Sequence, residues 1–522
     1  MVELMAPDMI TISDEQFKEV ILRRSVSLLK IANYLVQHRH FKEILTRPLL
    51  GELMSKSLQM EELLDTYGAR NNQKWQPFRL LTATVKQFSN VSYELLHVRH
   101  SLPAYKLLEI KKDFLGDTDL ALEFSGSVLQ QTAIQMINLA ADMGLDFPTE
   151  RVDKNTFEEN LPPGRLPADL ATRKIETVSK TVILLATAFL NLADESELVR
   201  TYGQTRIEEA DDYYVSDTIS EENLRQLELR FHNLQSLYDT YVSETEVEDM
   251  DKSLPTLRGH ISVVLHLVRI ATMIAHYYER HVHKQTISFK GCQSLLVNPG
   301  ELIKMLIEYC LNYTSIYLSS AHKMCQQMLR KYAEIGEIEV QVPRYRGFHV
   351  RPSTLIAKIV LHYGSKVDIK LGGESYNAAL PLDIFRINEK INAHKRKTLA
   401  CEIMELDIIK NNQEKDIKTI IYDTILNLAK AGKIMIYEQP LNLPDKLSFE
   451  KTETCSVLNL VTEEIARLQA IGKIDIQTDL TVRFVGDKRV LEDIKLLSVS
   501  GYGEDNFGNN LALPPEINYL RK

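Results

Sequence analysis

The residues of this chain best suited to chemistry are a histidine, an arginine and a proline within four positions: His349, Arg351 and Pro352. A neutral imidazole is a nucleophile near physiological pH. An arginine side chain can hold phosphoryl oxygens in its planar fork of donors. Proline is favoured at the first position of a helix, because its missing N–H would be unpaired there anyway. We therefore expect a helix to begin at Pro352, with His349 and Arg351 just ahead of it.

The start of such a helix is suited to binding an anion, because its unpaired N–H groups and its dipole both favour negative charge. Ser353 and Thr354 follow Pro352 in the expected first turn. We therefore assign phosphate binding to the helix start formed by Pro352, Ser353 and Thr354, and the catalytic roles to His349 and Arg351. The segment predicts a histidine that carries a phosphoryl group.

The eight residues from Gly347 to Thr354 resemble the active-site segment of the HPr phosphocarriers of the bacterial phosphoenolpyruvate:sugar phosphotransferase system. The family pattern runs Gly, aliphatic, His, small, Arg, Pro, small, small, and this chain departs from it at Phe348 and Val350. The resemblance implies that an enzyme I-like donor phosphorylates His349 at Nδ1 while Arg351 steadies the group. A protein acceptor or a regulatory target then receives it. We expect no cofactor and no metal, and a phosphocarrier with a phosphohistidine intermediate rather than a free-standing enzyme.

The elements expected around the motif follow the β-α-β-β-α-β-α order of that family, over roughly 336–432. Strands are expected at 338–342, 365–371, 374–378 and 399–409, and helices at 352–363, from Pro381 onward and at 416–431. Leu380 stands where Gram-positive members of the family carry a regulatory serine, so control by phosphorylation is not expected there. The helix from Pro381 is also longer than the family's.

The sequence on either side of the HPr-like region predicts two further structural regions. Residues 1–335 read as helices: Ser13 and Gln16 have the spacing of a capping box, and Leu28, Ile31, Ala32 and Leu35 recur with helical periodicity. A break is expected near 161–167. Residues 433–522 read as a small α+β region. We therefore expect a multidomain chain with a large all-α helical bundle, an α+β HPr-like open-faced β-sandwich and a small α+β C-terminal appendage.

Charge singles out the region of the motif. Residues 341–400 contain eleven basic and four acidic residues, a net charge of +7, whereas the whole 522-residue chain carries −9. A basic island in an acidic protein can steer an acidic partner or a phosphate group towards it. Alternatively, the island docks on the chain's own acidic part.

Other sequence features argue against several classes of protein. The five cysteines are widely spaced and form no CxxC pair, so neither a disulfide framework nor a zinc site is indicated. The N-terminus lacks the pattern of a signal peptide. The longest nearly apolar run, 182–190, is too short to cross a bilayer. We expect a cytoplasmic bacterial protein without membrane insertion.

Two alternative readings of basic and histidine-rich segments are disfavoured. His276 and Glu279 reverse the order of the Glu-x-x-His motif of di-iron bundles, and the second motif that such a site needs is missing. The basic run His394–Lys397 is short and has no interleaved aromatic residues, which argues against nucleic acid as a partner.

One alternative function stays open beside the phosphocarrier. The HPr-like fold would then be a catalytically silent protein-binding scaffold in which His349 only caps a helix. Fusion to a large helical domain favours regulation over bulk sugar transport in either case.

Overall fold

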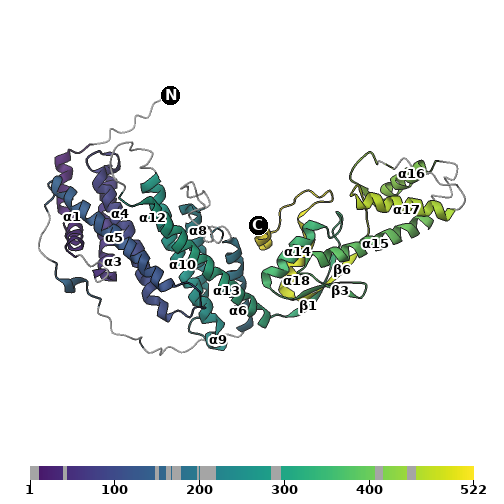
Figure 1. Ribbon diagram of the computed structural model, residues 1–522, viewed down its shortest axis with the longest axis horizontal. Coiled ribbons are helices and arrows are strands. Elements are labelled where there is room, and N and C mark those ends of the chain that lie inside the picture. Colours follow the sequence, from purple (N-terminus) through teal and green to yellow (C-terminus); the bar gives the residue numbers. More distant parts are fainter. Residues whose placement is uncertain are drawn as a thin grey trace, which may run out of the picture. The chain divides into compact units, whose positions relative to one another are not determined.

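The computed structural model describes residues 11–38, 44–146, 152–159, 178–196, 219–283, 296–405, 416–441 and 454–521, with the single positions Leu166, Val199, Thr201 and Leu443. The chain divides into two compact units, Met1–Met324 and Cys325–Lys522 (Figure 1). Apart from Leu166, the break expected near 161–167 lies outside the described residues.

The first unit is a helical bundle, as its periodicity predicts, and no described strand precedes Ile335. Ser13 caps the first helix, and Gln16 completes the predicted capping box. Helix α4 packs between α3 and α5, and α10 packs on α4 and α8. The helices are α1 (Asp14–Gln37), α3 (Arg47–Thr66), α4 (Gln76–Ser101), α5 (Phe114–Asp142), α6 (Val178–Glu195), α8 (Glu221–Tyr241), α9 (Glu246–Met250), α10 (Ser253–Tyr277), α12 (Pro299–Lys304) and α13 (Asn312–Lys331), the last of which continues into the second unit.

Helix α10 contributes a long and largely buried apolar stretch to this bundle. Among the described residues, Ser253–Val282 is the one helical stretch long and apolar enough to cross a membrane, and 83% of its most apolar window is buried inside the protein. The central helix of a soluble bundle is buried in the same way. This stretch is therefore weak evidence for a membrane-spanning helix. The expected absence of membrane insertion stays a prediction.

The second unit is built on a four-stranded antiparallel sheet with the order β1-β6-β2-β3. Figure 1 labels β1, β3 and β6 of this sheet. Ile369 and Phe484 are paired across β2 and β6, and both are fully buried. Their neighbours Lys370 and Arg483 point to the other face and are exposed, as the two-residue period of a strand requires. Helix α18 packs on β1 and β6, and α14 packs beside α18. These elements are β1 (Ile335–Gln341), α14 (Val350–Tyr363), β2 (Val367–Leu371), β3 (Glu374–Asn377), α15 (Pro381–Glu405), β6 (Thr481–Asp487) and α18 (Lys488–Val499).

The fourth strand expected at 399–409 is wrong for the described part of that range. Helix α15 continues to Glu405, and residues 406–409 lie outside the described residues. Leu399 and Ile403 are both buried and lie four residues apart, so they share one face of a helix. The strand that fills the place between β1 and β2 is β6, which lies far along the chain.

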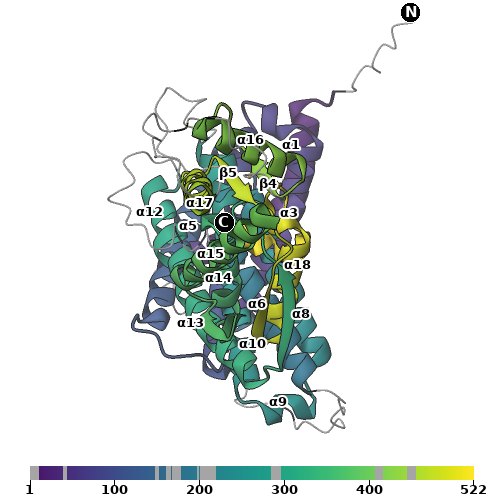
Figure 2. The same ribbon diagram turned by 90° about the vertical axis from the view of Figure 1, so that its right-hand side faces the viewer.

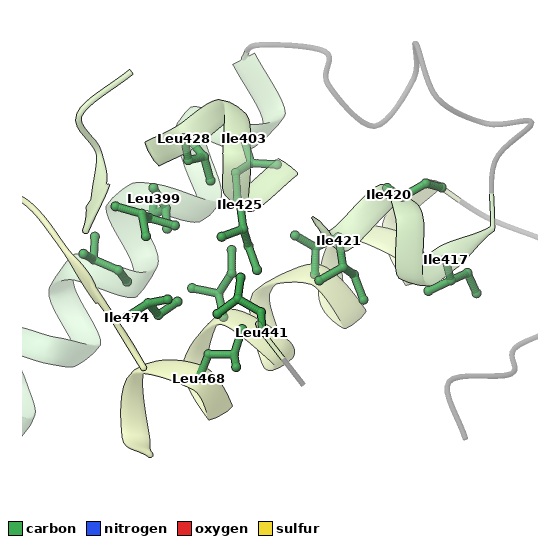
Figure 3. Close-up of a cluster of buried hydrophobic side chains, with 14 residues drawn as sticks. Leu399, Ile403, Ile417, Ile420, Ile421, Ile425, Leu428, Leu441, Leu468 and Ile474 are labelled. Atoms are coloured by element: carbon green, nitrogen blue, oxygen red, sulfur yellow. The ribbon is translucent and has the colours of Figure 1, made fainter. Parts of the chain in front are cut away.

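The chain between α15 and β6 forms a second small group of elements, which Figure 2 views from the front. Its hydrophobic cluster joins the end of α15 to α16, α17 and the β4–β5 pair (Figure 3). The predicted helix at 416–431 is present here as α16. The group consists of α16 (Ile417–Lys430), β4 (Ile434–Ile436), α17 (Thr454–Ala470) and β5 (Ile474–Ile476).

The expected appendage 433–522 is therefore not a separate part of the fold. Its first half, β4 to β5, packs with α15 and α16. Its second half supplies β6 and α18, which belong to the four-stranded sheet. The structure confirms the coarser prediction of a large helical part and a smaller α+β part.

Candidate functional site

His349 lies in the loop after β1, at the N-cap of α14. The helix begins at Val350, so Pro352 occupies its third position rather than the first as expected. Proline is tolerated there for the predicted reason, because the N–H groups of a helix's first turn have no partner inside the helix. The first of the regular bonds runs from the Ser353 N–H to the His349 carbonyl, over 3.2 Å.

The loop ahead of His349 is held by Asn388 of α15. The Asn388 Oδ1 accepts the Phe348 N–H at 2.8 Å, and its Nδ2 donates to the Arg346 carbonyl at 3.3 Å. Gly347 has φ +60°, and a Cβ there would lie 2.2 Å from Asn388 Oδ1. The Phe348 ring is fully buried. The position of His349 is therefore set by a hydrogen-bonded loop with a buried aromatic anchor.

The closest partner of His349 is Glu504, 155 residues further along the chain. His349 Nε2 lies 2.8 Å from Glu504 Oε1 and 2.9 Å from Oε2. Arg351 Nη1 donates to Glu504 Oε2 at 3.1 Å and to the Gly508 carbonyl at 3.0 Å. The Glu504 side chain is 2% exposed, against 24% for His349 and 36% for Arg351. A buried carboxylate thus joins the predicted nucleophile to the predicted phosphate-binding arginine.

Glu504 is the residue of this candidate site that the sequence does not reveal. It follows α18 and the short turn Gly501–Gly503, where no spacing relates it to His349. Only the fold brings the two segments together. A glutamate in a Gly- and Asn-rich stretch carries no local sign of such a contact.

Ser353 and Thr354 lie in the first turn of α14, where the sequence predicts N–H groups that bind phosphate. The Ser353 hydroxyl is buried and donates to the Phe348 carbonyl at 2.8 Å, and the Thr354 hydroxyl donates to the Val350 carbonyl at 2.7 Å. Both side chains therefore satisfy the backbone of their own turn. The N–H groups without a partner among the described residues at the start of α14 are those of Val350 and Arg351.

Aromatic rings connect the site to the group formed by α16, α17, β4 and β5. The Tyr345 ring stands edge-on to His349 with 5.3 Å between centroids, and Tyr437 stands edge-on to Tyr345 at 5.0 Å. Burial raises the pKa of Tyr437 above its ordinary value. In addition, Asp475 of β5 accepts the Arg346 N–H at 3.0 Å. The loop that carries His349 is thus contacted by the Tyr437 ring and the Asp475 carboxylate, neither of which belongs to the four-stranded sheet.

The basic island is less uniform than its net charge suggests. Lys395 is buried beside Asp475, Lys390 pairs with Glu374, and Arg386 pairs with Asp383. The run His394–Lys397 therefore does not present an unbroken basic face. Several of the cations are already neutralised inside the unit.

Two histidines of the helical unit, His266 and His276, are each paired with one carboxylate. His266 Nδ1 lies 2.9 Å from Glu94, and His276 Nδ1 lies 2.9 Å from Glu221. Within the part of the chain that the structure describes, no group of three or more potential metal ligands is found. Comparisons of the chain with protein-family models, with curated proteins and with solved structures give no match.

Proposed function

We propose that this protein is a phosphoacceptor of the HPr type, in which His349 is reversibly phosphorylated by an enzyme I-like donor. The group then passes to a protein acceptor, or the phosphorylated state acts as a signal. One observation carries the proposal: a partly exposed histidine at a helix start, with Arg351 two residues away and the N–H groups of Val350 and Arg351 without partners among the described residues. A phosphoryl group needs such an arrangement of nucleophile, cation and helix N-terminus.

The order of elements in the second unit supports an HPr-like fold for this site. Strand β1 is followed by α14, then by β2, β3 and α15, and then by β6 and α18. This is the β-α-β-β-α-β-α order, provided that residues 406–476 are taken as an insertion between the second helix and the fourth strand. The open face of the sheet, with Lys370 and Arg483, agrees with the same fold.

The proposed chemistry uses groups that are already close together. The lone pair of a neutral imidazole nitrogen attacks phosphorus, the bond between phosphorus and the donor breaks, and its electron pair leaves with the donor. Arg351 exchanges a contact with Glu504 or Gly508 for the phosphoryl oxygens. The N–H groups of Val350 and Arg351 take the remaining negative charge. The sequence predicts this role for the N–H groups around Ser353 and Thr354, but the Ser353 N–H already donates to the His349 carbonyl, so we propose the two N–H groups that precede it.

The test is phosphorylation of the full-length protein by phosphoenolpyruvate and enzyme I. We expect one acid-labile phosphate per chain, detected by mass spectrometry under alkaline conditions. His349→Ala abolishes the label, and Arg351→Ala slows its formation by about 100-fold, the typical effect of removing a donor to a developing anion. His394→Ala is the matched control, because His394 is exposed on α15 away from these contacts. An unlabelled wild-type protein, or a label that survives His349→Ala, would contradict the proposal.

The scaffold function remains the second candidate, and the contact with Glu504 is the observation that favours it. A buried carboxylate bonded to both His349 and Arg351 can serve as a structural link between α14 and the C-terminal segment. The simpler form, in which the histidine side chain caps the helix, lacks support because that side chain makes no capping hydrogen bond. The scaffold predicts that His349→Ala lowers stability while the wild type accepts no phosphate.

A further inference from the structure

We propose that Glu504 is a positioning residue that selects Nδ1 of His349 as the phosphoryl acceptor by keeping the ring proton on Nε2. This inference rests on the proposed function of His349 as a phosphoacceptor. It adds a positioning residue and a charge-stabilising contact that the eight-residue motif alone does not contain, and it gives a physical reason for the Nδ1 site that the resemblance implies.

The tautomer of the His349 ring follows from which of the bonded groups can donate a hydrogen. A carboxylate has no proton to give, so a hydrogen bond between Glu504 and Nε2 requires the hydrogen to sit on the ring. Both carboxylate oxygens lie within 2.9 Å of Nε2. A neutral imidazole with hydrogen on Nε2 carries its free lone pair on Nδ1. Nδ1 has no hydrogen-bond partner among the described residues, so that lone pair is available.

The segment that carries Glu504 is built to hold it in place. The Glu504 N–H donates to the Gly501 carbonyl at 3.2 Å, and Glu504 forms a β-bridge with Asn510. The Tyr502 ring is buried against Phe348, and its hydroxyl donates to the Gln341 carbonyl at 2.7 Å. The carboxylate is therefore anchored on the same loop system as His349. Preorganisation of this kind lets a charge act without reorientation during the reaction.

The same contact assists the transfer step. When the Nδ1 lone pair forms the bond to phosphorus and the donor leaves with its electron pair, the ring becomes an N-phosphorylated imidazolium. Its Nε2 hydrogen stays in place and faces the carboxylate, so the positive charge forms next to a fixed negative one. Transfer to an acceptor reverses these changes and restores the neutral ring. The His349 ring neither gains nor loses a proton in either direction.

The first test observes the proton itself and needs no phosphoryl donor. Full-length protein labelled with 15N-histidine is studied by NMR at a pH at which the imidazoles are neutral, and His349→Ala assigns the signal among the 14 histidines. We expect a slowly exchanging Nε2–H resonance for His349 that disappears in Glu504→Ala. A proton on Nδ1 in the wild type, or an Nε2–H resonance unaffected by Glu504→Ala, would overturn the inference.

The second test observes which nitrogen is phosphorylated. Phosphoramidate is used as a small donor that needs no partner protein, and the isomer is identified by 31P and 15N NMR. The wild type should carry phosphate on Nδ1, whereas Glu504→Ala should give a mixture with Nε2. Phosphorylation from enzyme I should be about 10- to 100-fold slower in the variant, as for other residues that orient a histidine.

Two control variants distinguish the loss of the Glu504 carboxylate from a general loss of folding. Glu516→Gln alters a carboxylate of the same tail that is exposed, and it should leave both results unchanged. Glu504→Gln keeps the side-chain volume, so it should fold even if Glu504→Ala proves unstable. It should still lose the single tautomer, because an amide can also donate to Nε2.

The outcomes distinguish the two proposals. Absence of any phosphate on His349 together with an intact Nε2–H resonance would remove the proposed function. Phosphate on Nε2 of the wild type would overturn the role of Glu504 and leave the phosphoacceptor function standing.

Discussion

The loop that carries His349 depends on Gly347 for two separate reasons. The backbone there has φ +60°, a conformation that costs a residue with a side chain about 1–2 kcal/mol. The space where a side chain would begin is occupied by Asn388 Oδ1, which accepts the Phe348 N–H. A residue other than glycine must therefore bear the strain and also displace the bond that fixes the loop.

These two costs can be separated by substitution at the residue scale. Gly347→Ala should lower the free energy of unfolding by about 2–4 kcal/mol, since it adds the loss of one or two hydrogen bonds to the backbone strain. Gly372→Ala is the matched control, because Gly372 has φ +58° with open space around it and should show the strain alone. Urea denaturation followed by circular dichroism measures both variants. Equal losses would mean that Asn388 contributes nothing.

At the scale of elements, a buried ion pair links α15 to the group formed by α16, α17, β4 and β5. Lys395 Nζ of α15 lies 3.4 Å from Asp475 Oδ1 of β5, and the two side chains are 3% and 2% exposed. Asp475 also accepts the N–H groups of Arg346 and Ile476. One carboxylate thus connects α15, β5 and the loop that leads to His349.

The two partners should respond unequally to substitution. Asp475→Asn leaves a buried ammonium without its counter-charge and should cost about 3–5 kcal/mol. Lys395→Met should cost less, because Asp475 keeps its backbone donors and the Gln469 side chain. The double variant should recover part of the loss. Urea denaturation of the wild type, the two single variants and the double variant gives the coupling free energy between Lys395 and Asp475. An equal loss of stability in both single variants would contradict the expected asymmetry.

At the scale of the whole molecule, each unit offers its own stability readout. Trp75 is the chain's single tryptophan and lies buried in the helical unit, so its fluorescence reports on that unit. Glu94 of α4 lies in the same unit, 2.9 Å from His266 and 3.2 Å from Arg269 of α10. Burial alone would raise the pKa of Glu94, but the hydrogen bond to His266 and the nearby positive charges hold it below its ordinary value.

The depressed pKa of Glu94 gives a pH-dependent prediction for the helical unit. A carboxyl group with a lowered folded-state pKa stabilises the protein above its ordinary value, and this contribution is lost as the pH falls through the folded value. Glu94→Gln should therefore destabilise the unit at pH 7, and the difference should shrink towards pH 3. Urea unfolding followed by Trp75 fluorescence measures it, with the exposed Glu52→Gln as control. A loss that does not change with pH would exclude the electrostatic origin.

Local features of this chain were readable from the sequence by itself. The capping box at Ser13, the helix after His349 and the helix at 416–431 all depend on residues within one or two turns of each other. Propensities and caps act over that range, so a linear pattern records them. The error of two residues at the start of α14 is small, because proline is tolerated anywhere in a first turn.

Only the tertiary structure decided which strand completes the sheet and which residue faces His349. Strand β6 lies between β1 and β2 although a whole group of helices and strands precedes it in the chain, and 399–405 continues a helix instead. Glu504 reaches His349 across 155 residues. Pairings of this kind depend on burial and on hydrogen bonds between distant segments, which leave no periodic trace in the sequence. The motif predicted a nucleophile, and the fold supplied the carboxylate that holds it.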